Sequence, residues 1–193
     1  MPWSKNFDVD SALEKAGEAF WERGYEATSL RDLLDAMGIQ KGSFYDTYGS
    51  KHEAYIRSLT AYADSRFAAF ARLTEDVTPR EGLAALINAV YQDCISPQGH
   101  RGCMIINCAL ELADHDPEAQ VVVKRAFKVH ARLFSSCIRA GQKSGEISPK
   151  LDAQATAQSM LGLVMGMRVY SRAGFPKTTI KTLAGQALAL VDG

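Results

Sequence analysis

Apolar residues recur at spacings of three and four along nearly the whole chain, and this periodicity is the strongest constraint on its fold. Leu13, Ala16 and Phe20 form one such stripe, with Glu14 and Glu18 on the opposite side. A period near 3.6 residues is that of an amphipathic α-helix. An alternating pattern, typical of a β-strand, never continues beyond four residues. We therefore predict an all-α fold.

The chain is expected to contain about nine helices, bounded by glycines, prolines and capping residues. Ser29-x-x-Asp32 and Ser50-x-x-Glu53 are capping boxes, which satisfy the free amides at a helix start. The predicted helices cover residues of about 10–23, 29–37, 40–48, 51–72, 79–95, 103–113, 117–144, 152–173 and 178–191.

Length and composition limit how these helices are organised. A chain of 193 residues forms one domain or two small ones that share a core. A change in composition near residue 73 predicts a helix-turn-helix domain over 1–50, a connecting helix over about 51–72, and a C-terminal antiparallel helical bundle over 73–193. No stretch approaches the run of about 18 apolar residues that a membrane helix needs. Acids also occupy the N-terminal positions where a secretory signal is apolar, so we expect a cytoplasmic protein with no membrane partner.

The stretch GIQKGSFYDTYGSK, residues 38–51, predicts how the N-terminal part works. Two short helices joined by a glycine-containing turn, after a supporting helix, describe a helix-turn-helix reader of the DNA major groove. Gly42 and Ser43 are small enough to let the second helix approach base edges, while Phe44 is expected in the core. Hydroxyl groups and a lysine that can hold phosphate oxygens come from Tyr45, Thr47, Tyr48 and Lys51.

Charge alone does not favour DNA binding. The whole chain has a formal net charge of zero, and residues 1–51 hold six basic side chains against nine acidic ones. A local basic face must therefore meet the phosphates, with the acids turned away. Few basic residues per subunit also predict a shallow salt dependence and a specificity that rests on base contacts.

The stretch TSLRDLLDAMGIQKGSFYDTYGSKHEAY, residues 28–55, resembles the N-terminal domain of the TetR family of bacterial transcriptional repressors. That family has a threonine or serine cap, an apolar helix, an A-G-V/I turn and then S-K-G-S-L/F-Y-x-H-F-x-S-K. The matching positions are Thr28, Leu34, Gly38-Ile39, Lys41 to Tyr45, Tyr48 and Ser50-Lys51. Gln40 replaces the usual serine, Thr47 replaces a common histidine, and Met37 replaces a frequent alanine.

The resemblance implies an all-α homodimer with one recognition helix per subunit and a C-terminal domain that binds a small-molecule inducer and releases the operator. Two half-sites would lie about 34–36 Å apart on double-stranded DNA. Gln40 is suited to adenine edges, and Asp46 is expected to face away from phosphate. The candidate DNA contacts are Thr28, Ser29, Gln40, Lys41, Gly42, Ser43, Tyr45, Thr47, Tyr48 and Lys51.

Residues 152–173 and the last helix are candidates for the dimer interface. Small residues let helices pack closely, and Arg168 and Arg172 are expected to keep the segment soluble. A helix buried within one subunit is the alternative, and the resemblance favours the dimer. The candidate interface residues are Ser159, Gly162, Gly166, Leu183, Ala187 and Leu190.

A ligand cavity is expected between the connecting helix and the bundle. The alternative for its aromatic and methionine residues is an ordinary core. Asn107 and Glu111, one turn apart on an apolar helix, need polar partners if they are buried. The candidate pocket residues are Phe67, Phe70, Met104, Asn107, Cys108, Glu111, Phe127, His130, Phe134, Met165 and Tyr170.

Residues 99–119 also resemble a segment found in a branch of the family that includes electrophile and oxidant sensors. Cys103 lies beside Arg101 at a predicted helix start, which favours a thiolate, and a small buried hydrophobe is the alternative. Cys94, Cys108 and Cys137 are interpreted as core residues. The histidines have no H-x-x-x-H spacing, so neither a metal site nor a cofactor is expected.

Two other functions remain open. A small all-α enzyme is one, but the sequence has no G-x-S-x-G, H-E-x-x-H or phosphate loop, so we expect no enzyme activity. A helical redox switch that has lost DNA binding is the other, and the acidic balance of residues 1–51 motivates it.

Overall fold

The computed structural model describes residues 7–192, and these residues are all-α, as predicted. Nine α-helices and one short 3₁₀ helix account for the regular structure of this part of the chain. They are α1 (Val9–Arg23), α2 (Leu30–Met37), α3 (Lys41–Tyr48), α4 (Lys51–Arg72), α5 (Pro79–Ile95), η1 (Gly99–Arg101), α6 (Met104–Glu111), α7 (Pro117–Ser144), α8 (Ala153–Arg172) and α9 (Lys177–Ala189).

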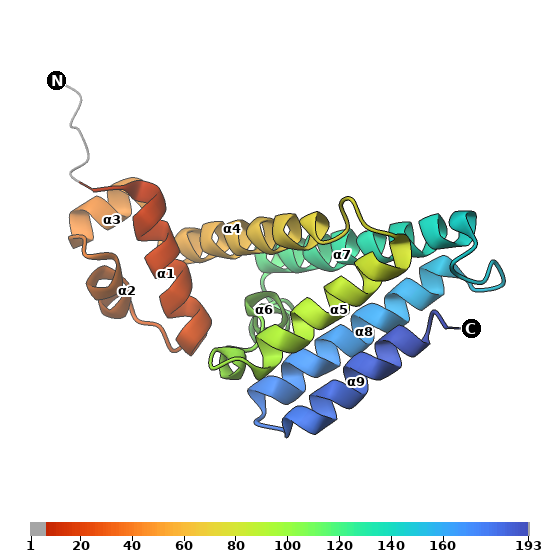
Figure 1. Ribbon diagram of the computed structural model, residues 1–193. Coiled ribbons are helices and arrows are strands. Elements are labelled where there is room, and N and C mark those ends of the chain that lie inside the picture. The colour runs from red at the N-terminus through yellow and green to blue at the C-terminus, as the bar shows by residue number, and fades with distance from the viewer. Residues whose placement is uncertain (1–6, 193) are drawn as a thin grey trace.

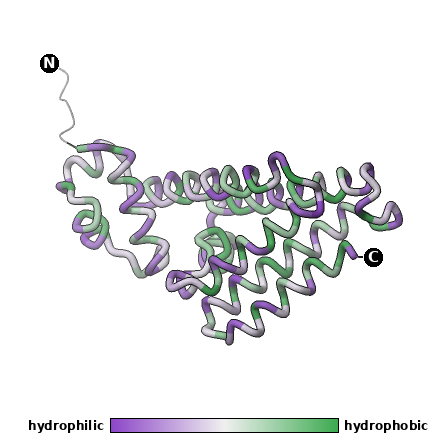
Figure 2. Tube along the Cα trace, in the orientation of Figure 1, coloured by the Kyte–Doolittle hydropathy of each residue, from purple (hydrophilic) through white to green (hydrophobic). Residues whose placement is uncertain are grey.

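Side-chain caps fix where the N-terminal helices begin. The Ser29 hydroxyl accepts the backbone N–H of Asp32, and the Asp32 carboxylate accepts the backbone N–H of Ser29. Ser50 caps α4 by accepting the N–H of Glu53, but its own N–H donates to the Tyr48 carbonyl and not to Glu53. Both predicted caps therefore lie at helix starts, and only the one at Ser29 is a complete capping box. Figure 2 shows hydrophobic and hydrophilic residues recurring along each helix. Because each helix thus has an apolar face, it packs that face against its neighbours.

The helices form an elongated molecule with a small three-helix unit at one end (Figure 1). Helices α1, α2 and α3 make this unit, and the long α4 runs from it along α7. Helices α5, α8 and α9 pack next to one another on the other side of α7, and α6 lies between them and the three-helix unit. Among residues 7–192, no helix is long and apolar enough to cross a membrane.

Two hydrophobic cores hold the molecule together, and they do not follow the predicted division at residues 50 and 73. The first core joins buried residues of α1 to α4 to buried residues of α6 and the beginning of α7, such as Met104, Cys108 and Val123. The second core joins the end of α4 to α5, the later part of α7, α8 and α9. Helix α6 is therefore packed into the core of the N-terminal unit.

Candidate nucleic-acid interface and ligand cavity

The turn between α2 and α3 has the geometry of a helix-turn-helix. Gly38 ends α2 with a left-handed backbone (φ 69°), and its N–H donates to the Leu34 carbonyl at 2.9 Å. A side chain at this φ is strained, which explains the glycine. Phe44 is fully buried in α3 and Leu33 is fully buried in α2, so both helices are anchored by one face. The opposite face of α3 is left free.

The free face of α3 carries most of the predicted DNA contacts. Gly42 is exposed, and a Cβ placed there would meet no atom of the chain within 4 Å. The Tyr45 side chain is 45% exposed. The other predicted contacts that reach the surface are Gln40 and Lys41, which are exposed, and Ser43, Thr47 and Lys51, which are partly buried. Asp46 is exposed as well, so a carboxylate stands on the same short helix.

Two of the predicted DNA contacts are wrong, because their side chains are buried inside the subunit. Thr28 has no exposed surface, and its hydroxyl donates to the Gly24 carbonyl at 2.6 Å. Tyr48 is 1% exposed, and its hydroxyl donates to the Val9 carbonyl at 2.7 Å. Both residues hold α1 against the helix-turn-helix and cannot reach a phosphate.

Three polar side chains flank α3 and show how the site is supported. Ser29 is exposed, but its hydroxyl is used in the bonds to Asp32. The Lys51 ammonium lies 4.3 Å from the centre of the Tyr25 ring, which holds it at the first turn of α4. Arg57, which sequence reasoning missed, donates to the Thr47 carbonyl at 3.1 Å and covers the Tyr48 ring. The signal in the sequence was its position about two turns into α4, the helix capped by Ser50, which places Arg57 close to α3.

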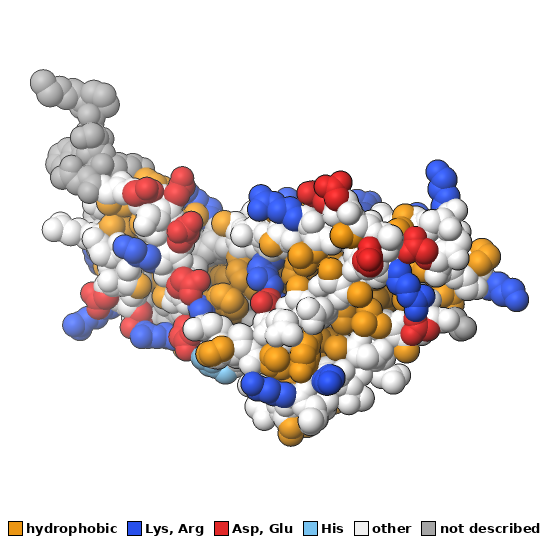
Figure 3. Space-filling view, viewed as in Figure 1, with side chains coloured by type: hydrophobic (Ala, Val, Ile, Leu, Met, Phe, Trp, Pro, Cys, Tyr) orange, Lys and Arg blue, Asp and Glu red, His pale blue; other side chains and the backbone are white. Residues whose placement is uncertain are grey.

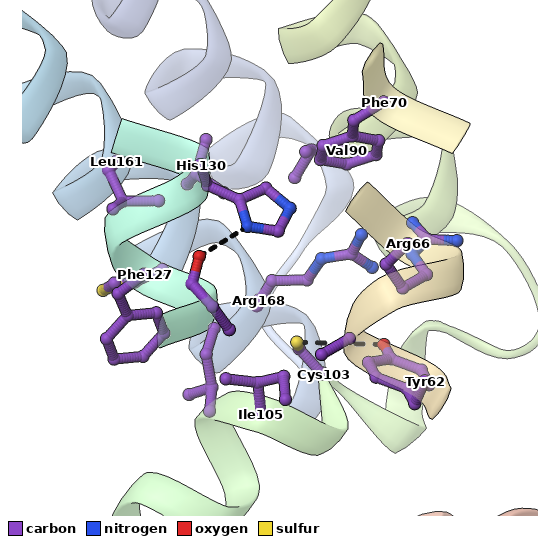
Figure 4. A pocket seen from close by; sticks show the side chains of 15 residues that line it. Tyr62, Arg66, Phe70, Val90, Cys103, Ile105, Phe127, His130, Leu161 and Arg168 are labelled. Atoms are coloured by element: carbon purple, nitrogen blue, oxygen red, sulfur yellow. Dashed lines mark hydrogen bonds between the residues drawn. The ribbon is translucent and has the colours of Figure 1, made fainter. Parts of the chain in front are cut away.

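A cavity of about 60 Å³ lies between α4, α7, α8 and the start of α6 (Figure 4). Its wall is mostly apolar. Four of the predicted pocket residues line it, namely Phe70, Phe127, His130 and Met165. The predicted redox residue Cys103 lines it as well. The remaining lining residues were not predicted: Tyr62, Ala63, Arg66, Val90, Ile105, Ile106, Ala126, Leu161, Val164 and Arg168.

An ion cluster closes one end of the cavity. One carboxylate oxygen of Asp93 accepts from Arg66 and, at 2.8 Å, from Arg168. Burial raises the pKa of Asp93, but the two guanidinium groups outweigh it and hold this pKa below its ordinary value. The prediction that Arg168 keeps α8 soluble is wrong, because only 9% of its side chain is exposed. Arg168 follows Leu161 by seven residues and Val164 by four, so all three lie on one face of α8, and this spacing in the sequence indicated that Arg168 is buried.

Cys103 is the N-cap residue of α6 and faces the cavity. The Tyr62 hydroxyl donates to its sulfur at 3.8 Å, as Figure 4 shows. Burial is the largest cause that raises the pKa of Tyr62, so this hydroxyl stays protonated at neutral pH. Cys103 is only partly buried, whereas Cys94, Cys108 and Cys137 are buried, which confirms the core interpretation of those three.

His130 supplies the cavity with a neutral polar group. Burial lowers its pKa below the ordinary value. Its Nδ1 lies 2.8 Å from the Ala126 carbonyl. A carbonyl only accepts hydrogen bonds, so Nδ1 carries the proton and Nε2 is an acceptor. The Phe67 ring packs edge-on against this imidazole but does not line the cavity.

The other predicted pocket residues lie elsewhere. Met104, Cys108 and Phe134 are core residues, and Tyr170 stacks on Phe175 at the surface. Asn107 and Glu111 line a separate groove of about 300 Å³ beside the cavity. Their polar partners come from the protein itself: Asn107 donates to the Arg101 carbonyl, and Glu111 accepts the backbone N–H groups of Tyr25 and Glu26.

The predicted dimer residues divide into three groups. Ser159 and Gly162 are exposed on α8, and a Cβ at Gly162 or Gly166 would meet no atom of the chain within 4 Å. Leu183 and Leu190 are partly buried. Ala187 has no exposed surface and belongs to the second core, so its assignment to an interface is wrong.

Comparisons with known proteins decide the family. Residues 12–54 match the family described as "Bacterial regulatory proteins, tetR family". Residues 79–182 match "Tetracyclin repressor-like, C-terminal domain". The chain belongs to the TetR family. TetR-family regulators bind DNA as dimers and respond to small molecules, and this chain is a DNA-binding transcriptional regulator of that kind.

Individual relatives agree with the family. The chain is 31% identical to the HTH-type transcriptional repressor ComR of Escherichia coli (strain K12), over 96% of this chain and 90% of that protein. It is 33% identical to the HTH-type transcriptional regulator YezE of Bacillus subtilis (strain 168), over 77% of each. A cysteine mutant of the TetR-family regulator CifR, solved with 26-bp double-strand operator DNA, has a TM-score of 0.82 and 27% identity, covering 96% of this chain and 97% of that one. These relatives are transcriptional regulators, not enzymes.

Proposed function

We propose that this TetR-family chain is a cytoplasmic repressor, without enzyme activity, that binds a pseudo-palindromic operator as a homodimer. In this proposal residues 1–50 bind DNA, and residues 73–193 bind the inducer and the partner subunit. The observation that carries it is the free polar face of α3, which stands on a buried Phe44 and Tyr48. The operator-bound CifR structure supports the same use of the fold.

The exposed residues of α3 divide between base edges and phosphates. Gln40 has an amide that pairs bidentately with adenine, and it makes no capping bond within the chain. Gly42 permits close approach, because nothing but solvent covers it. Lys41, Tyr45 and Lys51 supply donors to phosphate oxygens. Ser43 and Thr47 complete the proposed contact surface.

Ligand binding has a physical route to the DNA-binding unit. Segment 99–116, which begins at η1 and carries Cys103 at the cavity, makes polar contacts with that unit and with the first turn of α4. The Arg101 guanidinium donates to Glu18 of α1 at 2.6 Å, and Glu111 accepts the two N–H groups after α1. The Asp116 carboxylate lies 2.6 Å from His52 Nε2 of α4. A ligand that displaces this segment therefore moves the helix-turn-helix.

A mobility-shift and footprinting assay on DNA flanking the gene tests DNA binding. We expect sequence-specific retention by the wild type at moderate salt. Tyr45→Ala and Lys51→Ala each remove a phosphate donor and weaken retention, because charge-assisted and neutral bonds contribute on the order of 1–3 kcal/mol. Lys150→Ala is the control, since Lys150 is exposed far from α3 in the chain and should leave retention unchanged. No specific retention by the wild type would reject the repressor and favour a redox switch without DNA binding.

We also propose that Cys103 reacts with an electrophilic inducer. Its thiolate adds to the β-carbon of an α,β-unsaturated carbonyl compound, the π pair moves to the carbonyl, and the α-carbon gains a proton from water. The partly buried sulfur at the cavity wall supports this site over the three buried cysteines.

The test for Cys103 is release of the operator by methyl vinyl ketone. We expect release from the wild type and from Cys137→Ser, whose thiol is buried. Cys103→Ser should keep the DNA bound, because serine is a far weaker nucleophile than a thiolate. Equal release from Cys103→Ser and the wild type would refute the reaction at Cys103.

A further inference from the structure

The polar end of the cavity has more positive than negative charge. Arg66 and Arg168 converge there from α4 and α8 (Figure 4). Both donate to the same oxygen of Asp93. The other polar groups at this end, the Tyr62 hydroxyl and the Cys103 sulfur, bond to each other. Two cations therefore share one anion at the wall of an apolar cavity.

Water reaches part of this cluster, because 31% of the Arg66 side chain and 39% of the Asp93 side chain are exposed. Only 9% of the Arg168 side chain is exposed, and its hydrogen bond to Asp93 uses one of the five N–H donors of a guanidinium. None of the remaining Arg168 nitrogens is both buried and unpartnered, so a second anion is able to approach this guanidinium. Carboxylate and phosphate both pair bidentately with a guanidinium, and the carboxylate is the smaller group, which suits a cavity of about 60 Å³.

The adjoining groove provides a basic approach to this site. It has a volume of about 300 Å³ and shares Cys103, Ile106 and Arg168 with the cavity. Arg23 and Arg172 also line it. The lining of the groove thus holds three arginines and one carboxylate, Glu111, which keeps its negative charge while it accepts the N–H groups of Tyr25 and Glu26. Arg23 is paired with Asp32.

We propose that the cavity and groove select a small molecule with an apolar body and one carboxylate group. The carboxylate binds Arg168 and Arg66 in competition with Asp93, and the apolar body packs against Phe127, Val164 and Met165. This ligand binds reversibly and is distinct from the electrophile proposed to modify Cys103, and the inference rests on the proposed ligand-controlled function. Competition for Arg66 also loosens the bond between α4 and α5, since Asp93 belongs to α5.

Calorimetric titration with two matched probes tests this selection. The probes are 3-phenylpropionate and its neutral amide, 3-phenylpropanamide, which have the same body and lack a double bond that could alkylate Cys103. We expect the acid to bind at least about tenfold more tightly, as a charge-assisted bond predicts. Equal affinities, or no binding of the acid, would overturn the inference.

The substitution Asp93→Asn distinguishes competition with the ligand from a purely structural role of the ion cluster. Removing the internal competitor destabilises the free protein but should tighten binding of 3-phenylpropionate by about tenfold and leave the amide unchanged. Asp64→Asn is the matched control, because Asp64 pairs with Arg125 on an exposed part of α4 and α7. Arg168→Met should weaken binding of the acid alone. Unchanged acid affinity in Asp93→Asn would contradict the competition.

Both titrations are made without DNA, so they are independent of operator binding. A protein that retains its operator but does not prefer the acid would refute only the carboxylate selection. A protein that prefers the acid but shows no specific retention of DNA would refute only the repressor proposal.

Discussion

Gly42 and Phe44 stand two positions apart in α3 and have opposite surroundings. Phe44 is fully buried and fixes the helix on the core, while nothing in the chain lies within 4 Å of a Cβ at position 42. Gly42 also has no positive φ, so neither packing nor backbone geometry within the subunit requires a glycine there. Under the proposal that DNA binds this face, the missing side chain lets the DNA approach the helix backbone.

Replacing Gly42 with alanine should therefore separate stability from DNA binding. Alanine is the better helix former, so Gly42→Ala is expected to raise the free energy of unfolding by about 0.5–1 kcal/mol. An added methyl group in a close-packed contact costs on the order of 1–3 kcal/mol, which weakens operator binding about five- to hundredfold. Urea denaturation and footprinting measure the two effects.

Gly17→Ala provides the control for this substitution. Gly17 lies within α1, and its Cβ would meet Ser58 at an ordinary contact distance of 3.5 Å. Gly17→Ala should change stability without changing operator affinity. Operator affinity that stays at the wild-type level in Gly42→Ala would show that the DNA does not approach this position.

At the scale of the element, sequence periodicity and caps predict the helices well. Capping boxes and left-handed glycines act over a few residues, so α2, the turn at Gly38 and the start of α4 follow from local patterns. Hydrogen bonds that side chains make to other elements do not follow from such local patterns. The sequence does not show that Val9 accepts the Tyr48 hydroxyl, because the two residues are 39 positions apart.

The candidate cavity illustrates the same limit. Phe70, Phe127, His130 and Met165 were predicted from residue type, which does not separate a cavity from a core, so Met104 and Phe134 were predicted with them. Arg66 and Arg168 were missed because charged residues are usually exposed. Only the fold brings both of them to Asp93 of α5.

At the scale of the whole molecule, α6 belongs physically to the DNA-binding half. Its buried residues complete the first core, and Glu111 at its end binds the backbone after α1. The second core contains α8 and α9, whose exposed residues are mostly small or uncharged polar ones with few charges among them. Figure 3 shows this face of the molecule. Charged side chains of both signs gather instead on the three-helix unit. The charged three-helix unit thus suits a charged partner such as DNA, and the sparsely charged face of α8 and α9 suits a second protein subunit.

A charge placed on the outer face of α8 should separate the two subunits. Gly162 is exposed, and a Cβ there meets no atom of its own subunit within 4 Å, so we expect Gly162→Glu to leave the fold intact. A buried unpaired carboxylate at an interface costs several kcal/mol, so we expect the dimer to dissociate to the 21.1 kDa chain. Sedimentation equilibrium measures this mass, and Val121→Glu on exposed α7 is the control that stays dimeric.

Loss of operator retention should accompany dissociation, because two half-sites are then no longer bound together. A Gly162→Glu protein of twice the chain mass would place the interface on another face.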